Sequence, residues 1–398
     1  MKYKLAYFCT LLTAVLFTSV FAQRVPDDAS PNGIQNFCAA ENCVAGLWMY
    51  KRLYKTEPSQ LPYNFIQSND LNFSERLLVN KANALFQSNP IISMMLIEKN
   101  KIIFEKYKEP INSSTALAGF SMTKTVTSMT VGQAICSDSG IKLESKGNEL
   151  NKNLIGTAQG NSTIQQLLTM TSGGLRGTLS MGAWPKNGGQ IGSTSYRGYK
   201  NIPILIKDYG QREASLEKLD EYLKPGEEFS YKNTDTIALS LALSGENPQK
   251  FNEYFNEKLA PLIGFENPVY WVHDENGYTY TSTSFHATMK DWGRLAQFVL
   301  NKLNDLEKSC YSNYIKAAAT TQVKNYSNRH GKDFYSGEGF GGYGYGFWTE
   351  NKMKSNAIYL VGARGQRIAI DKNGQKIMII FSTDEKDLGS IYSFFNSW

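Results

Sequence analysis

A serine and a lysine stand three positions apart in the stretch GFSMTKTVTSM, where Ser121 and Lys124 open a predominantly apolar segment. Residues with this spacing lie on the same face of a helix, so the lysine amine can reach the serine hydroxyl. Burial and the positive end of a helix both disfavour a charged lysine, and both therefore lower its pKa toward that of a useful base. The pair predicts a serine nucleophile activated by a lysine. On these residues alone, an incidental polar edge on a packed helix explains the pattern equally well.

The Ser-x-x-Lys spacing is common, and the chain contains it at two further places. Ser139 and Lys142 flank a glycine in SDSGIK, which is typical of a turn. Ser215 and Lys218 belong to SLEKLDEYL, which predicts an amphipathic helix with Ser215 as its N-cap and Lys218 on its solvated face. Only the pair that begins with Ser121 opens an apolar helix directly after a predicted hairpin.

A Tyr-x-Asn element could supply a proton relay beside such a pair, and candidates begin at Tyr231, Tyr311 and Tyr326. The last two lie in polar surroundings and are typical of surface loops. Tyr231 follows the turn sequence LKPGEEFS and precedes the apolar helix TIALSLALS, so a loop could deliver it into a cleft. A tyrosine hydroxyl near a lysine can relay a proton, and Asn233 can hold a substrate carbonyl or amide.

Other kinds of catalytic centre are poorly supported. GFSMT resembles the Gly-x-Ser-x-Gly nucleophile elbow but has Thr123 in place of the second glycine. His286 could be a triad base, but its position at the start of a predicted helix favours a capping or surface histidine. The sequence has no CxxC or HExxH motif and its histidines lie far apart, so no metal centre is expected.

Hydrophobic periodicity predicts the elements that would position these residues. Helices are expected at residues 73–86, 121–136 and 286–303, in the segment 162–174, and at the C-terminus. Strands are expected in a hairpin over 92–107, turning at Lys99-Asn100-Lys101, and over 357–383, with a break at Gly362 and a turn at Asn373-Gly374. The order of strands, helices and strands predicts one α/β unit whose sheet is completed by both ends of the chain.

The first residues, MKYKLAYFCTLLTAVLFTSVFAQ, are typical of a secretory signal. Lys2 and Lys4 form a basic head, and small residues predict cleavage after Ala22. The apolar run is short for a membrane span, which needs about 20 residues, although an uncleaved anchor is an alternative. We therefore expect a signal peptide at 1–22, an N-terminal extension at 23–72 and one domain at 73–398. The mature protein is expected to be periplasmic or secreted, with no membrane span.

The cysteines and the charge add further expectations. Cys38 and Cys43 in FCAAENC close a short loop and predict a disulfide in an oxidising compartment. Cys136 ends an apolar helical stretch and is interpreted as a buried small hydrophobe. The net charge of +6 is scattered, with basic clusters no longer than pairs, so no nucleic-acid partner is expected.

Taken together, five segments resemble those of the serine hydrolases related to class C β-lactamases, in the same order and over roughly residues 90–385. They are FSMTKTVTSM, STIQQLLTMTSGG, KPGEEFSYKNTD, ATMKDWGRLAQFVL and GYGYGFW. This group includes β-lactamases, D-alanyl-D-alanine carboxypeptidases, β-lactamase-like esterases and 6-aminohexanoate-oligomer hydrolases. Within the group, the chain is most similar to the esterases and amide-oligomer hydrolases.

The resemblance implies an α+β fold of the β-lactamase and penicillin-binding-protein type. Helices would cover a mostly antiparallel sheet, with a helical lobe inserted at about residues 125–230. Ser121 would be acylated, Lys124 would take its proton, and Tyr231 would assist proton transfer. Asn233 would orient Lys124 and the substrate.

The implied reaction is hydrolysis of a small ester, amide or peptide-like substrate through an acyl-enzyme, without a cofactor. One alternative within the same group is a true β-lactamase or D,D-peptidase. Another is a non-catalytic protein of the same fold that binds a peptide or peptidoglycan fragment.

The third sequence element departs from the family pattern. Relatives place Lys or His, a small residue and Gly on the strand that edges the cleft, whereas this chain has Ala363, Arg364 and Gly365. Neighbouring side chains on a strand point to opposite faces, so Arg364 is expected to point away from the cleft or to lie at a different depth. Because Gly365 has no side chain, it permits a substrate to approach the backbone closely. The backbone amide of Gln366 is expected to form an oxyanion hole with that of Ser121.

Overall fold

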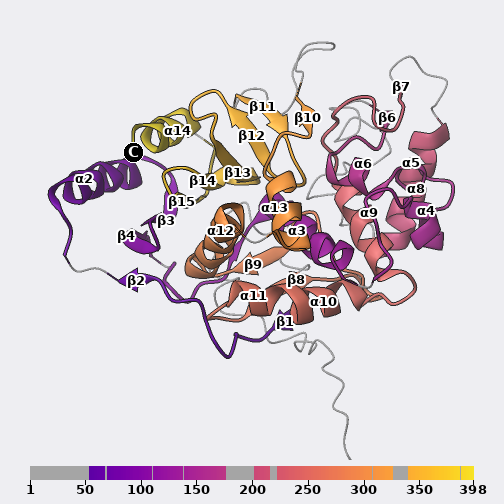
Figure 1. Cartoon of the computed structure of the whole chain (residues 1–398), viewed down its shortest axis with the longest axis horizontal. Helices are drawn as coiled ribbons and strands as arrows, with labels where there is room; N and C mark the ends of the chain where they lie inside the picture. Colours follow the sequence, from indigo (N-terminus) through magenta and orange to yellow (C-terminus); the bar gives the residue numbers. More distant parts are fainter. Residues whose placement is uncertain are drawn as a thin grey trace, which may run out of the picture.

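The computed structural model describes residues 53–67, 70–109, 111–137, 139–175, 201–215, 222–306, 308–325, 339–385 and 387–398. A large sheet with helices on both faces occupies one side of the molecule, and a lobe of shorter helices lies beside it (Figure 1). The architecture is the α+β arrangement, rich in antiparallel strands, that the resemblance implied.

The large sheet has the strand order β10-β11-β12-β13-β14-β15-β3-β4-β2. Its neighbouring strands are antiparallel, except that β2 runs parallel to β4. Strand β15 pairs with β3, which confirms that both ends of the chain complete one sheet. The strands are β2 (Ile66–Gln67), β3 (Ile91–Glu98), β4 (Lys101–Tyr107), β10 (Val323–Lys324), β11 (Phe340–Tyr343), β12 (Trp348–Asn351), β13 (Ala357–Gly362), β14 (Gln366–Asp371) and β15 (Lys376–Ser382).

Two smaller sheets accompany the large one. The first has the order β1-β8-β9-β5 and the second pairs β6 with β7. Their strands are β1 (Leu53–Thr56), β5 (Leu117–Ala118), β6 (Gly174–Leu175), β7 (Tyr222–Leu223), β8 (Val269–Val272) and β9 (Phe285–Ala287). Strands β1 and β2 precede the domain start expected at residue 73, yet each pairs with a strand of the main body.

Helices cover both faces of the large sheet. Helix α12 (Met289–Asn304) packs against β3, β14 and β15, whereas α2 (Phe73–Ser88) and α14 (Leu388–Ser397) lie over the other face (Figure 1). The other helices are α3 (Thr123–Ile135), α4 (Gly147–Leu150), α5 (Ala158–Asn161), α6 (Ile164–Leu168), α8 (Ile202–Ser215), α9 (Asn233–Ser244), α10 (Lys250–Tyr254), α11 (Ala260–Ile263) and α13 (Cys310–Ala318). Single turns of 3₁₀ or π-helix are η2 (Phe120–Met122), η3 (Lys152–Leu154), η5 (Phe255–Leu259) and η7 (Ala363–Gly365).

Strand β15 shows why the central strands are continuously apolar. Ile377 and Ile379 belong to the core cluster on the α12 side, whereas Met378 and Ile380 belong to the cluster under α2 and α14. Because successive side chains of a strand point to opposite faces, a strand covered on both sides needs an unbroken apolar run. The same rule applies to β3 and β14, whose alternate residues also belong to the two clusters.

Several predicted elements are confirmed. Helix α2 spans the expected residues 73–86, the hairpin over 92–107 turns at Lys99 and Asn100, and β13, β14 and β15 divide residues 357–383 as predicted. The segment 162–174 contains α6, whose N-cap Thr163 accepts a hydrogen bond from the amide of Gln166. These elements are set by local patterns of apolar, capping and turn residues.

Two helix predictions were wrong at their ends. Ser215 belongs to α8, which begins at Ile202, so it does not cap the start of a helix, and Tyr222–Leu223 form a strand rather than helix. Residues 216–221 lie outside the described residues. His286 lies on β9, and α12 begins only after Thr288, whose hydroxyl accepts a hydrogen bond from the amide of Asp291. The imidazole of His286 is buried, which lowers its pKa to about 4, so the capping or surface role was also wrong.

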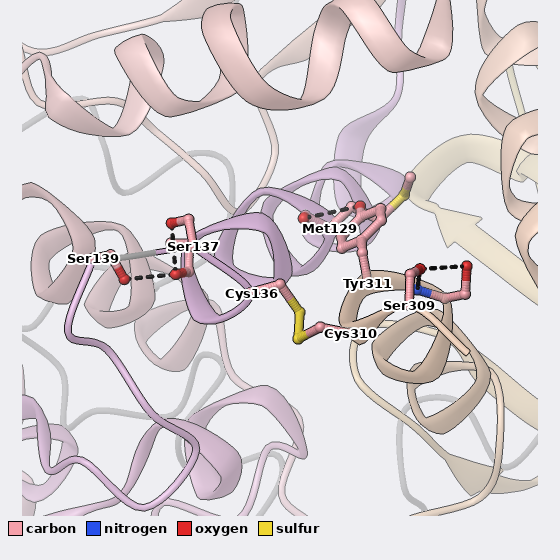
Figure 2. The surroundings of a disulfide bond; sticks show 9 residues. Met129, Cys136, Ser137, Ser139, Ser309, Cys310 and Tyr311 are labelled. Atoms are coloured by element: carbon pink, nitrogen blue, oxygen red, sulfur yellow. Dashed lines mark hydrogen bonds between the residues drawn. A yellow bond between two sulfur atoms is a disulfide. The ribbon is translucent and has the colours of Figure 1, made fainter. Parts of the chain in front are cut away.

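The interpretation of Cys136 was wrong as well, because it forms a disulfide with Cys310. Figure 2 shows this bond joining the residue after α3 to the first residue of α13. Beside it, the hydroxyl of Tyr311 donates to the carbonyl of Met129 on α3 at 3.1 Å. The partners are 174 residues apart in sequence, so no local pattern revealed the pairing. The predicted Cys38–Cys43 disulfide lies outside the described residues.

The Cys136–Cys310 bond should contribute measurably to stability. Replacing both cysteines by serine removes a crosslink that closes a loop with a sequence separation of 174 residues. Because the crosslink constrains the unfolded chain, its removal typically lowers the free energy of unfolding by about 2–5 kcal/mol. We expect a lower melting temperature for this double variant in calorimetry, and a similar decrease when the wild type is reduced. The oxidised wild type is the reference, and a melting temperature of the Cys136→Ser/Cys310→Ser variant equal to that of the reference would contradict the prediction.

Candidate active site

Ser121 lies at the junction where η2 continues into α3, and its side chain is partly exposed. The residue before it, Phe120, has a φ of 46°, which is unusual for a bulky residue. A Cβ on Gly119 would lie 2.3 Å from the indole of Trp292, so only glycine fits there. Such strain persists only where the surrounding structure enforces it, and it is often found at functional sites. The chain therefore holds Ser121 in one fixed position.

Lys124 lies one turn further along the same face. Its side chain is 2% exposed, and its Nζ is 3.0 Å from the Oγ of Ser121. Burial lowers the pKa of Lys124 to about 7. The physical reason is that an ammonium group loses its hydration in the interior, so the neutral amine becomes accessible near neutral pH. The geometry and the pKa are both those of a general base for Ser121.

A second contact fixes the direction of the Lys124 amine. Its Nζ donates a hydrogen bond of 2.9 Å to the carbonyl of Ser282. The neutral amine has two N–H groups and one lone pair, so donation to this carbonyl leaves the lone pair available to Ser121. Sequence reasoning missed Ser282, because a backbone carbonyl has no signature in the sequence.

Hydrogen bonds to α3 hold the segment around Ser282 in place. The hydroxyl of Thr127 donates to the carbonyl of Thr281 at 2.7 Å, and the amide of Phe285 donates to the hydroxyl of Thr123 at 3.1 Å. The run TSTSF therefore follows the nucleophile helix closely. Its concentration of small hydroxyl residues was the one available signal in the sequence.

The ring of Tyr231 lies next to the amine of Lys124. The centroid of its ring is 5.0 Å from the Nζ of Lys124, and the side chain is buried against Trp348, with 5.4 Å between the ring centroids. Asn233 begins α9 and is also buried. The structure thus brings Tyr231 to the Ser121–Lys124 pair, as the sequence predicted. The roles of the Tyr231 hydroxyl and the Asn233 amide in catalysis stay predictions.

The third element is a turn and not part of a strand. Strand β13 ends at Gly362, and Arg364 adopts a left-handed conformation with a φ of 63°. The argument from strand alternation therefore does not apply to Arg364. Its guanidinium carbon lies 6.0 Å from the ring centroid of Phe120, directly before the nucleophile, and its backbone amide donates to the carboxylate of Glu385 at 2.9 Å.

Gln366 has a clear structural role in this turn. Its side-chain amide donates to the carbonyls of Ala363 at 3.1 Å and Ser382 at 2.8 Å. The buried guanidinium of Arg367 donates to the carbonyl of Gly362. These bonds fix the turn, and Gly365, which has a φ of 83°, completes it. The backbone amide of Gln366 as an oxyanion donor stays a prediction.

Gly362 places this turn beside the nucleophile, because a Cβ on it would lie 2.3 Å from the carbonyl oxygen of Gly119. Of the other two serine–lysine pairs, only Ser139–Lys142 is fully described, and it does not assemble into such a site. The hydroxyl of Ser139 donates to the carbonyl of Ala134 at the end of α3, and Lys142 is exposed. Lys218 lies outside the described residues.

The pKa of Lys124 predicts the pH dependence of any reaction that uses it as a base. Below a pKa of about 7 the amine is protonated and cannot accept the proton of Ser121, so activity is lost as the pH falls through this value. One pH unit below the pKa, roughly a tenth of the lysine is neutral. We therefore expect the acylation rate to fall about tenfold for each further unit of acidification. A stopped-flow pH profile measures this, and a rate that stays flat through the same range would exclude Lys124 as the base.

Comparisons with known proteins add an independent finding. Residues 84–390 match the model of the family described as Beta-lactamase. None of the curated protein sequences matches the chain.

Solved structures with a similar fold include three at low sequence identity. A Bacillus anthracis protein assigned as a 6-aminohexanoate-dimer hydrolase has a TM-score of 0.62 at 20% identity, over 86% of this chain and 87% of that chain. The octameric penicillin-binding protein homologue from Pyrococcus abyssi has a TM-score of 0.59 at 17% identity, over 81% and 75%. A Bacteroides dorei protein assigned as a β-lactamase has a TM-score of 0.57 at 17% identity, over 79% and 91%. At these identities the likeness shows the fold alone.

Proposed function

Because the chain belongs to the β-lactamase family, we propose that it is a serine hydrolase that cleaves an ester or amide through an acyl-enzyme on Ser121. One observation carries this proposal. The Nζ of Lys124 is buried, lies 3.0 Å from the Oγ of Ser121, and has a pKa of about 7. A structural lysine on a packed helix needs none of these three properties.

The proposed acylation step begins with the neutral amine of Lys124. It takes the proton of Ser121 while the serine oxygen bonds to the substrate carbonyl carbon, which gives a tetrahedral oxyanion and a protonated Lys124. The backbone amides of Ser121 and Gln366 would stabilise the oxyanion. When the bond to the leaving group breaks, its oxygen or nitrogen receives the proton from Lys124 through the hydroxyl of Tyr231. Water then attacks the acyl carbon and gives up a proton to Lys124, the bond between the acyl carbon and the serine oxygen breaks to release the carboxylic acid, and Lys124 returns the proton to Ser121.

Labelling with a fluorophosphonate tests the proposal directly. The serine oxygen displaces fluoride at phosphorus, so a competent nucleophile leaves a stable phosphonate ester on its own peptide. We expect one adduct per chain, located by mass spectrometry on Ser121, together with turnover of p-nitrophenyl acetate. A wild-type protein that is folded but takes up no label would favour the non-catalytic peptide-binding alternative.

Substrate preference follows from the third element. Relatives meet a substrate carboxylate with a cation at the position of Ala363, and this side chain offers none. A missing charge-assisted hydrogen bond is worth about 1.5–3 kcal/mol, or roughly one to two decades in rate. We therefore expect short-chain p-nitrophenyl esters to have a higher kcat/KM than nitrocefin. Steady-state kinetics with both substrates measures this difference.

Arg364→Ala is the informative variant for that prediction, because Arg364 brings a cation close to Phe120. A loss confined to nitrocefin would show that Arg364 has taken over the role of the missing cation. Efficient nitrocefin turnover that does not respond to this variant would refute the specificity argument.

We also propose that the protein is exported after cleavage behind Ala22. Within the described residues, no helix combines the length and apolar character needed to cross a membrane. The Cys136–Cys310 disulfide supports export, because Cys310 is exposed and such bonds persist mainly in oxidising compartments. Intact-mass analysis of secreted material should give a chain that begins at Gln23.

A further inference from the structure

Lys232 stands between the two residues of the Tyr-x-Asn element, yet its side chain is only 1% exposed. Its backbone is extended, with a φ of −139° and a ψ of 140°. In extended backbone, successive side chains point to opposite sides. Tyr231 reaches the Ser121–Lys124 pair, so Lys232 points the other way, into the interior of the helical lobe. A lysine is rarely buried to this degree unless its amine is paired.

The amine of Lys232 is bound by the loop that follows α6. Its Nζ donates to the hydroxyl of Ser172 at 3.3 Å and to the carbonyl of Gly173. The hydroxyl of Ser172 in turn donates to the carboxylate of Asp235 at 2.7 Å. Asp235 is fully buried in the first turn of α9, where a negative charge also interacts favourably with the helix dipole. Ser172 therefore connects a buried cation to a buried anion.

Backbone contacts attach the same loop to the segment that leads into Tyr231. The amide of Ser230 donates to the carbonyl of Met170 at 2.8 Å, and the amide of Gly226 donates to the carbonyl of Thr171 at 2.7 Å. A Cβ on Gly173 would lie 2.4 Å from the carbonyl of Leu223, so the two segments are in close contact. Hydrogen bonds from the residues on both sides of Tyr231 thus attach its segment to the loop that follows α6.

We propose that Lys232 is a positioning residue, whose bonds to Ser172 and Gly173 set the orientation of Tyr231 toward Lys124. This inference rests on the proposed function, because it assigns a task to Tyr231 in proton transfer. The extended backbone couples the two side chains mechanically. When the amine of Lys232 is held in the lobe, rotation of the segment is blocked and the Tyr231 ring stays beside the Lys124 amine. A displacement of about 1 Å at such a group can cost a hundredfold in rate.

The variant Lys232→Met tests this, because methionine keeps an unbranched side chain but has no N–H donor. We expect kcat for p-nitrophenyl acetate to fall about 10- to 100-fold, with KM changed less than about threefold, because proton transfer is affected and substrate binding is not. Lys224→Met is the matched control, since Lys224 is exposed in the same segment. It should retain wild-type kcat and KM.

Loss of the amine also removes the cation that Ser172 links to the buried carboxylate of Asp235, which can destabilise the fold. The double variant Lys232→Met/Asp235→Asn removes both charges and should regain melting temperature relative to Lys232→Met. If Lys232 positions Tyr231, kcat stays low in this double variant although the fold is restored. Recovery of wild-type kcat together with the melting temperature would overturn the inference, as would wild-type kcat in Lys232→Met.

Two further readouts separate this inference from the proposed function. If wild-type protein takes no fluorophosphonate on Ser121, the proposed function fails. Hydrogen exchange reports on Lys232 without reference to activity. Lys232→Met should accelerate exchange in peptides covering 169–174 and 230–236, with the rest of the described chain unchanged. Unchanged exchange in both peptides would overturn the inference even in an active enzyme.

Discussion

Replacement of Ser121 by alanine is expected to abolish both fluorophosphonate labelling and ester hydrolysis. The hydroxyl of Ser121 lies 3.0 Å from the Lys124 amine and is the group proposed to form the acyl bond. The loss should exceed the 10²–10⁴-fold typical of a missing acid–base group, because the covalent step itself disappears. Active-site titration and p-nitrophenyl acetate turnover measure it.

Ser139→Ala is the matched control for that variant, because Ser139 belongs to the same Ser-x-x-Lys pattern. Its hydroxyl donates to the carbonyl of Ala134, so the change removes a structural hydrogen bond at the end of α3 and leaves the site intact. Label uptake and turnover should remain at the wild-type level. Labelling that persists in Ser121→Ala would refute the assignment of the nucleophile.

Replacement of Lys124 by alanine should reduce the acylation rate by about 10²–10⁴-fold. Without the amine, no group takes the proton of Ser121, and the hydroxyl is a weak nucleophile at its ordinary pKa. The loss should be seen in the single-turnover rate of acylation, and the decline of activity below a pH of about 7 should disappear with it.

Lys142→Ala provides the control for this second variant, because Lys142 is exposed and occupies the corresponding position in the Ser139 pair. It should acylate at the wild-type rate. A Lys124→Ala variant that acylates nearly as fast as the wild type, with its pH profile unchanged, would exclude the lysine as the base and leave Ser121 to another activator.

The sequence by itself determined the elements whose patterns are local. Ser121 and Lys124 share a helix face because they stand three positions apart, and this spacing needs no tertiary information. The hairpin that turns at Lys99 and Asn100, and the apolar run of β15, follow from turn chemistry and from the two-residue period of a strand. The order of five such segments was also sufficient for the family and the fold.

The first and last residues of the helices were harder to predict from the sequence. His286 has the polar character of a helix start, but strand pairing with Ala118 and Tyr270 places it in a sheet. Local propensity is weak compared with the burial of a whole segment, so the tertiary contacts decided the boundary.

Only the tertiary structure decided the properties on which the proposed chemistry of the candidate site depends. Lys124 has a pKa of about 7 because distant segments exclude water from it, and its amine is directed by the carbonyl of Ser282, 158 residues further along the chain. The pairing of Cys136 with Cys310 and the turn that carries Arg364 were equally invisible in the sequence. The physical reason is common to all of them. Desolvation, backbone hydrogen bonds and crosslinks depend on which segments meet in space, whereas a sequence pattern records only what neighbours along the chain can do.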